Sequence, residues 1–224
     1  MKEPYEYAEM DLIEFAAMDI VGTSNDSTTL ETSATDECEG EGATAWKPVI
    51  YLYPERDSEV SVKLQLDGKL TCTYPAYNGG WTVTAAPDST LTDGTGQLYN
   101  YLYWEGKTNA CWDMSRGFCV KGADTAAFLD DALEKLGLTR REANEFIVYW
   151  LPMMQDNPYN LICFQTEVYT NAAKLEVTPA PDTVIRVFMA WQRVDSYKEI
   201  PTQELTAPPR NGFTVVEWGG SEVK

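Results

Sequence analysis

A break in composition near residue 46 limits most strongly how this chain can fold. Residues 1–46 carry 12 of the 35 acidic residues and a single basic one. Residues 22–45 hold one large apolar side chain, Leu30, among small and acidic residues. Such a segment cannot bury enough apolar surface to offset the entropy of ordering it. The sequence therefore predicts an acidic tail over residues 1–45, ending in a flexible linker, and a single folded domain over residues 46–220.

The first part of the tail, residues 5–21, alternates apolar and acidic side chains. Two interpretations stay open for it. It can form a short helix that docks on the domain or on a partner, or a helix that is only marginally stable alone. The stretch is too charged to cross a membrane, and no other stretch of the chain predicts a membrane span.

The chain contains no histidine, which removes several kinds of catalytic site. Neither a Ser-His-Asp triad nor a Cys-His pair can be built, and a His-ligated zinc site is excluded. The formal net charge of −18 argues against a nucleic-acid partner, because binding to the phosphate backbone needs clustered Lys and Arg. No Cys-x-x-Cys pair occurs either. The sequence predicts no metal site and no cofactor.

Runs of β-branched and aromatic residues predict strands in the first part of the domain. The run Val60–Leu66 alternates strictly between apolar and polar side chains, as a half-buried strand does. It is followed by Asp67-Gly68, a typical two-residue hairpin signal. We therefore expect an antiparallel meander, with strands at residues 49–53, 60–66, 69–74, 81–86 and 98–104.

Two helices are predicted next, over residues 124–137 and 139–154. Thr139 followed by Glu142 is a capping box, and Gly137 ends the first helix. The pair superficially resembles a DNA-binding helix-turn-helix, but its second helix is apolar where a DNA reader needs basic side chains. Strands return at residues 159–167, 183–191 and 213–218. The fold class is therefore α+β, an antiparallel sheet or β-sandwich with an inserted helical hairpin.

The five cysteines leave the disulfide pattern open. Cys111 and Cys119 lie eight residues apart and can bridge if they occupy a hairpin. An odd number of cysteines leaves at least one thiol free or shared between chains.

Paired carboxylates are the remaining route to an enzyme, because they need no histidine. Glu105 ends an aromatic run, Glu145 lies on the second predicted helix, and Glu167 ends a predicted strand. Two of the three can form a glycosidase-like pair if they converge in one pocket. Solvated charges at strand ends and on a polar helix face are the simpler interpretation.

Aromatic residues are the most distinctive feature of the domain. Tyr99, Tyr101 and Tyr103 fall on one face of the strand predicted at residues 98–104. If exposed, they form a stacking platform for a glycan or protein; if buried, they are core residues with polar ends. The candidate ligand-binding residues are Trp81, Tyr99, Tyr101, Tyr103, Trp104 and Glu105.

Several stretches resemble an uncharacterised family of bacterial proteins. They are Lys-Pro-Val-Ile-Tyr-Leu-Tyr-Pro-Glu at residues 47–55, Gly-Phe-Cys-Val-Lys-Gly at residues 117–122, and Asn-Glu-Phe-Ile-Val-Tyr-Trp-Leu-Pro at residues 144–152. The resemblance implies a secreted or cell-envelope setting. The family has no known activity, so the resemblance implies no catalytic residues.

These observations favour a non-catalytic binding or interaction module at the cell surface or outside the cell. Its expected partner is a protein or a glycan. The alternative is a carboxylate-based hydrolase that uses two of Glu105, Glu145 and Glu167.

Overall fold

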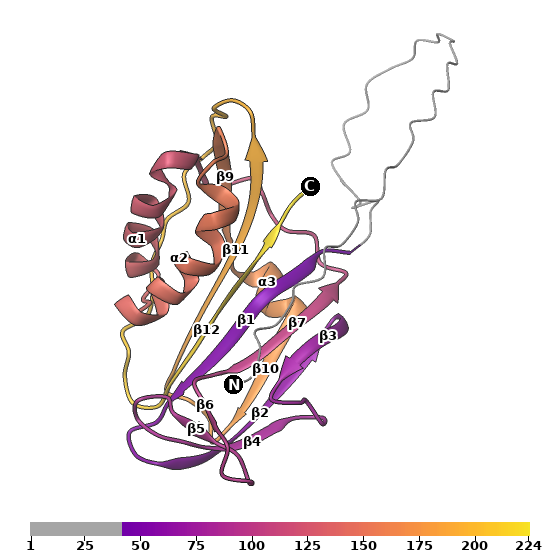
Figure 1. The fold of residues 1–224 in the computed structure, drawn as a ribbon, viewed down its shortest axis with the longest axis vertical. Helices are drawn as coiled ribbons and strands as arrows, with labels where there is room; N and C mark the ends of the chain where they lie inside the picture. Colours follow the sequence, from indigo (N-terminus) through magenta and orange to yellow (C-terminus); the bar gives the residue numbers. More distant parts are fainter. Residues whose placement is uncertain (1–41) are drawn as a thin grey trace, which may run out of the picture. The chain divides into compact units, whose positions relative to one another are not determined.

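The structure is a computed structural model that describes residues 42–224, which belong to one compact unit (Figure 1). The helix predicted at residues 5–21 and nearly all of the predicted linker lie outside the described residues.

The larger of two sheets has seven strands in the order β3-β7-β1-β12-β11-β9-β8. All neighbours are antiparallel except β11 and β12, which run parallel. Its strands are β1 (Thr44–Tyr53), β3 (Gly68–Tyr74), β7 (Leu102–Thr108), β8 (Phe118–Lys121), β9 (Tyr159–Gln165), β11 (Thr183–Val194) and β12 (Thr214–Glu222).

The smaller sheet has five antiparallel strands in the order β10-β2-β4-β5-β6, and it packs on one face of the larger sheet. Side chains from both sheets share one core, which explains the sandwich. The strands are β2 (Ser58–Leu66), β4 (Trp81–Ala85), β5 (Leu91–Thr92), β6 (Leu98–Tyr99) and β10 (Ala173–Thr178).

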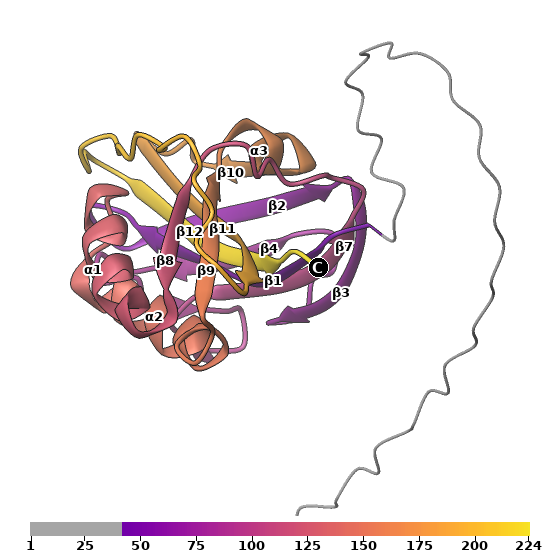
Figure 2. The same cartoon turned by 90° about the horizontal axis from the view of Figure 1, so that it is seen from above.

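Two helices, α1 (Thr125–Lys135) and α2 (Arg140–Met154), cover the opposite face of the larger sheet (Figures 1 and 2). They form a hairpin inserted between β8 and β9. A single 3₁₀ turn (Gly122–Asp124) precedes α1, and the short α3 (Glu167–Ala172) leads into β10.

The central strand β1 shows why the sheet is covered on both sides. Val49 and Tyr51 pack against the helices, whereas Ile50 and Leu52 pack against the smaller sheet. Because successive side chains point to opposite faces, an apolar run without alternation is typical of a strand buried on both faces. The layers are therefore helix pair, larger sheet and smaller sheet.

The predicted fold class is confirmed, as is the helical hairpin. The capping box at α2 is present: the side chain of Thr139 accepts from the N–H of Glu142, and the Glu142 carboxylate accepts from the N–H of Thr139 at 2.7 Å. The segments β8, α3 and β10 were not predicted. β8 and α3 are too short to show a clear period, whereas β10 was missed although its residues alternate between apolar and polar side chains.

The predicted antiparallel meander is wrong. β2 belongs to the smaller sheet and β3 to the larger one, so Asp67-Gly68 is a corner between sheets and not a hairpin. Gly68 has φ = 148°, and a β-carbon there would lie 2.0 Å from the carbonyl oxygen of Lys107. The glycine is needed for this close approach of two backbones.

The single strand predicted at residues 98–104 is also wrong. The chain leaves the smaller sheet after β6 and enters the larger sheet at β7. Tyr99 therefore does not share a strand face with Tyr103. The alternation of side chains along a strand cannot reveal this change of sheet, because β6 and β7 both carry aromatic residues and follow one another closely.

The Cys111–Cys119 bridge considered above does not form. Cys111 is disulfide-bonded, whereas Cys119 carries a free thiol, as do Cys72 and Cys163. Burial raises the pKa of the Cys163 thiol to about 11, which keeps it protonated.

Among residues 42–224, no helix has both the length and the apolar character needed to cross a membrane.

Two glycines in β12 make room for neighbouring layers. A β-carbon on Gly219 would lie 2.9 Å from the ring of Pro48 in β1. A β-carbon on Gly220 would lie 2.6 Å from both the Trp150 ring and the carbonyl oxygen of Met189. The pair of glycines thus lets β1 and α2 pack closely on β12.

We expect Gly220→Ala to lower the free energy of unfolding by about 2 kcal/mol, because the methyl group overlaps a fully packed ring and a backbone oxygen. Urea unfolding followed by tryptophan fluorescence measures this. Gly94→Ala is the matched control, since a β-carbon there meets nothing within 4 Å. Equal stability of Gly220→Ala and the wild type would contradict the packing described.

Candidate functional site

Lys47 lies at a bulge in β1. The pairing of β1 with β7 shifts register between Ala45 and Val49, and the pairing with β12 shifts between Trp46 and Val49. The backbone φ of Lys47 is 59°, which is uncommon for any residue but glycine. A bulge re-aims a side chain, and strained backbone persists only where the surroundings hold it.

The re-aimed side chain lies among three tyrosine rings. Its Nζ lies 5.2 Å from the ring centre of Tyr101, 5.4 Å from that of Tyr103 and 5.8 Å from that of Tyr149. Nζ also donates to the Tyr101 hydroxyl at 3.4 Å, and the backbone N–H of Lys47 donates to Glu105 Oε1 at 3.2 Å. We call these five half-buried residues the Lys47 cluster.

Two hydroxyls of the Lys47 cluster, those of Tyr103 and Tyr149, stay protonated near neutral pH. Burial, and then the neighbouring carboxylate of Glu105, raises the pKa of Tyr103. The same two causes raise the pKa of Tyr149. The cluster therefore presents aromatic rings, hydroxyl donors, one ammonium group and one carboxylate over a small area.

Tyr51 links the Lys47 cluster to α2. Its ring meets that of Tyr101 edge-on, with centres 5.4 Å apart. Its hydroxyl donates to Glu145 Oε2 at 2.7 Å, and Glu145 also lies 3.6 Å from Arg141. Burial, followed by the hydrogen bond to Glu145, raises the pKa of Tyr51.

A second network fixes the loop that precedes β12. The buried Glu142 accepts from the Tyr53 hydroxyl at 2.6 Å and pairs with Arg210. Arg210 also donates to the carbonyl oxygen of Gly137 at 2.9 Å, at the end of the first helix. These bonds hold the loop against the helix pair.

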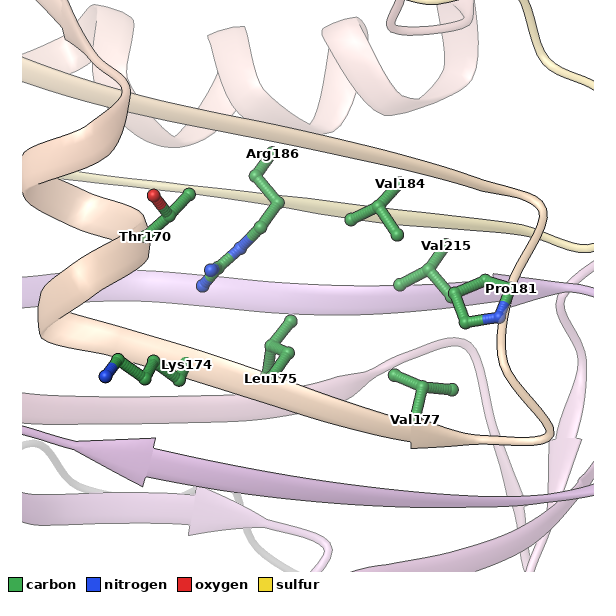
Figure 3. Close-up of a pocket in the computed structure, with 8 residues that line it drawn as sticks. All are labelled: Thr170, Lys174, Leu175, Val177, Pro181, Val184, Arg186 and Val215. Carbon is green, nitrogen blue, oxygen red and sulfur yellow. The ribbon is translucent and has the colours of Figure 1, made fainter.

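A cavity of about 490 Å³ lies between the two sheets, where the edge strand β10 faces β11 (Figure 3). We call it the inter-sheet cavity. Its lining residues are Thr170 from α3, Lys174, Leu175 and Val177 from β10, Pro181 from the connection before β11, Val184 and Arg186 from β11, and Val215 from β12.

Arg186 belongs to a buried polar cluster in this wall. Its Nε donates to Glu217 Oε2 at 2.6 Å, and Trp104 Nε1 donates to Glu217 Oε1 at 3.0 Å. The guanidinium carbon lies 4.6 Å from the ring centre of Tyr169. Burial alone would lower the pKa of Arg186, but the charge of Glu217 more than offsets this, so its pKa is raised and it stays charged.

The predicted ligand-binding residues are divided between core and surface. Trp81 is 3% exposed and Trp104 is fully buried, so both are core residues with satisfied polar ends. Tyr99 lies in the smaller sheet and donates to Asp93, whose pKa falls to about 2, chiefly through its hydrogen bond with Thr95. The Lys47 cluster brings together the remaining three: Tyr101, Tyr103 and Glu105.

The three candidate catalytic carboxylates occupy different surroundings. Glu105 belongs to the Lys47 cluster, and Glu145 is held by Tyr51 and Arg141. Glu167 is exposed at the start of α3 and lines a second cavity of about 390 Å³ beside the first. No three His, Cys, Asp or Glu side chains in the described part of the chain gather as a metal site would require.

Sequence reasoning missed Lys47, Arg186 and Glu217 as site residues. For the last two a signal exists: each is a charged residue inside an otherwise apolar run that predicts a central strand. Lys47 gives no such signal, because its bulge depends on the pairing of three strands.

Comparison with known proteins gives one relative. Over 63 residues the chain is 49% identical to an "uncharacterized protein in bglA 3'region" of Butyrivibrio fibrisolvens. The match takes in 27% of this chain and 65% of that protein, so the chain spans about two-thirds of the relative's length. No family model and no solved structure matches the chain. The similarity to an uncharacterised bacterial protein agrees with the resemblance drawn from the sequence.

The strain at Lys47 can be measured by comparing two substitutions. We expect Lys47→Ala to lose about 1 to 2 kcal/mol of unfolding free energy, because the contacts with the tyrosine rings are lost. Lys47→Gly should be more stable than Lys47→Ala by about 1 kcal/mol, since glycine adopts φ = 59° freely.

The same pair of substitutions at Lys69, an exposed residue of β3 with ordinary backbone geometry, is the control. At Lys69 the alanine variant should be more stable than the glycine variant, because glycine weakens a strand. An alanine variant at Lys47 more stable than the glycine variant would show that the left-handed backbone is not adopted.

Proposed function

We propose that this protein is a non-catalytic binding module of the cell surface or the extracellular space, and that its partner is a glycan. The Lys47 cluster is the proposed binding surface. The observation that carries the proposal is the strained Lys47, whose side chain is held among three half-exposed tyrosine rings. Strain of this kind clusters at functional sites, where it positions a side chain.

The chemistry of the cluster suits a carbohydrate. Tyrosine rings offer an apolar face to the C–H groups of a sugar ring, and their hydroxyls offer hydrogen bonds at the edge. The ammonium of Lys47 and the carboxylate of Glu105 add a donor and an acceptor for sugar hydroxyls. Each group lies in a half-buried setting, which keeps it accessible while limiting its motion.

A protein partner is less well supported by the same residues. The buried centre of a protein–protein interface is depleted in Lys and Glu, whereas this surface has one of each at its centre. Two exposed apolar residues adjoin cluster residues in the sequence, Trp46 beside Lys47 and Val148 beside Tyr149, and single apolar side chains of this kind are normal on a protein surface.

The compartment is part of the proposal. The disulfide at Cys111 supports an oxidising environment, because disulfides persist outside the cytosol. The resemblance to secreted or cell-envelope proteins supports the same setting.

A carboxylate-based hydrolase has less support. Neither Glu105 nor Glu145 lines either of the two cavities described. A glycosidase needs its two carboxyl groups on opposite sides of a substrate held in a pocket.

Screening the full chain on a glycan array tests the proposed function. We expect Tyr101→Ala and Tyr103→Ala each to weaken binding of the best glycan by about tenfold, since each removes one stacking face. Tyr197→Ala is the matched control, because Tyr197 is 63% exposed but lies outside the cluster. Unchanged binding by both cluster variants, or no glycan bound by the wild type, would refute the proposed surface.

The compartment has its own test. Protein isolated from its own cells is denatured and alkylated with and without prior reduction, and its peptides are analysed by mass spectrometry. We expect Cys111 to react only after reduction, whereas Cys119 reacts without it. Alkylation of Cys111 without reduction would place the protein in a reducing compartment.

A further inference from the structure

We propose that the larger sheet binds an extended peptide segment of a partner protein beside β11, and that this segment alternates apolar with basic side chains. The site is separate from the Lys47 cluster and goes beyond the proposed glycan binding. Three features carry the proposal: an open strand edge inside the sheet, a cavity next to that edge, and two carboxylates in the wall of the cavity.

β11 is paired on both sides over only part of its length. Its residues Thr183–Trp191 pair with β12, whereas its pairing with β9 begins only at Phe188, opposite Gln165. After Gln165 the chain leaves the larger sheet and turns into α3. Residues 183–187 of β11 therefore form an open edge within the sheet. We call this edge, together with the cavity beside it, the strand gap.

The open edge presents backbone groups at the repeat of a β-strand. The N–H of Thr183 donates to the carbonyl oxygen of Phe213, just before β12. Because successive residues of a strand point their backbone groups to opposite sides, the N–H and C=O of Val184 and Arg186 point into the strand gap. Neither residue's backbone makes a hydrogen bond on that side within residues 42–224. The two sets of groups lie about 6.6 Å apart, a repeat that another extended backbone matches.

A cavity of about 390 Å³ occupies the place that a further strand would take. Its walls are residues 164–167 at the turn from β9 into α3, Val184–Val187 of β11, and residues 203–208 of the loop that precedes β12. It adjoins the inter-sheet cavity, with which it shares Thr170 and Val184 (Figure 3). Val184 is 44% exposed although β11 lies inside the larger sheet, and a strand in the gap would cover it.

The loop that forms the far wall is fastened only at its ends. The side chain of Gln203 makes hydrogen bonds of 2.9 and 2.6 Å with the backbone of Phe164. At the other end, the carbonyl oxygen of Pro209 accepts from the hydroxyl of Thr183 at 3.3 Å. Residues 204–208 make no hydrogen bond within the described part of the chain. This segment can therefore shift outward to admit a strand without breaking a hydrogen bond.

Two carboxylates give the strand gap a negative charge. Glu167 and Glu204 are exposed and line the cavity. Arg186 lines it as well, but this guanidinium is paired with the buried Glu217. No other charged residue in the part of the chain that the structure describes lines this cavity. The gap therefore favours a peptide with a basic side chain, and the acidic N-terminal residues of the chain itself are a poor match.

The two faces of an added strand would meet different surroundings. On the helix side the cavity is lined by Leu136 and Leu205, which pack against the core under the helices. On the other side lies α3, whose Tyr169 packs in the core shared with the smaller sheet and whose first residue is Glu167. Since side chains alternate between the faces of a strand, apolar residues would contact the first side and basic residues the second. Main-chain hydrogen bonds would supply affinity, and the alternating side chains specificity.

Selection from a phage-displayed library of random heptapeptides on the full chain tests the partner chemistry. We expect selected peptides in which β-branched residues alternate with Lys or Arg. Synthetic forms of these peptides should bind at least about tenfold more tightly than the same peptides with Glu in place of the basic residues. Selection of no peptide, or equal binding of the acidic forms, overturns the proposal.

Amide hydrogen exchange of the full chain, with and without the best synthetic peptide, tests the mode of binding. In the free chain, the N–H groups of Val184 and Arg186 should exchange at least about tenfold faster than those of Ile185 and Val187, which face β12. Saturating peptide should slow exchange at the first pair by about tenfold or more and leave the second pair nearly unchanged. Unchanged exchange at Val184 and Arg186 in the saturated complex overturns strand addition.

Two variants locate the site. Val184→Pro removes an N–H that has no partner in the fold, and proline is tolerated at an open strand edge, so the variant should lose peptide binding while unfolding in urea as the wild type does. Glu204→Lys should weaken binding of the basic peptide by about tenfold, because it reverses an exposed charge in the cavity wall. Glu199→Lys is its matched control, since Glu199 is exposed but lines neither cavity.

Three results would overturn the assignment to a partner peptide. They are full binding by a folded Val184→Pro variant, the same loss in the Glu204→Lys and Glu199→Lys variants, and self-association of the full chain that the peptide reverses. The last result, seen by analytical ultracentrifugation, would identify a second copy of the chain as the occupant of the strand gap.

Discussion

The carboxylate of Glu217 is fully buried in the middle of the larger sheet, and much of the architecture follows from the need to neutralise it. An unpaired buried charge costs several kcal/mol, so both oxygens require donors. Arg186 supplies one from β11, the parallel neighbour of β12, and Trp104 supplies the other from β7, which lies beyond β1. The strand order around β12 and the burial of Trp104 are thus tied to one carboxylate. The same pair places a guanidinium in the wall of the inter-sheet cavity.

The sequence predicted those features of the fold that depend on residues close together along the chain. The helical hairpin and its capping box are local features, because Thr139 and Glu142 satisfy each other within one turn. The strands at β2, β9, β11 and β12 are found because their side-chain pattern is local as well. Partners of strands are not local. Asp67-Gly68 carries a hairpin signal yet connects two sheets, since the close approach of Lys107 that requires a glycine is invisible in the sequence.

The candidate site was also predictable only where it depends on residues close together in the sequence. Tyr101, Tyr103 and Glu105 were found because aromatic and acidic residues follow one another closely in the sequence. Lys47 was missed because the register shifts that re-aim it arise from pairing with β7 and β12, far away in the sequence. Trp81 and Trp104 were included because tryptophan suits both a binding surface and a core; their burial depends on which sheet face each one occupies.

The position of β12 sets the order in which this chain can acquire its structure. The last strand of the sequence lies in the middle of the larger sheet, between β1 at one end of the domain sequence and β11. Until residues 214–222 are available, those two strands have no common neighbour, and Arg186 and Trp104 lack the carboxylate that joins them. A chain that lacks residues 214–222 therefore cannot close the sheet. Closure waits for these residues and brings together the two ends of the domain.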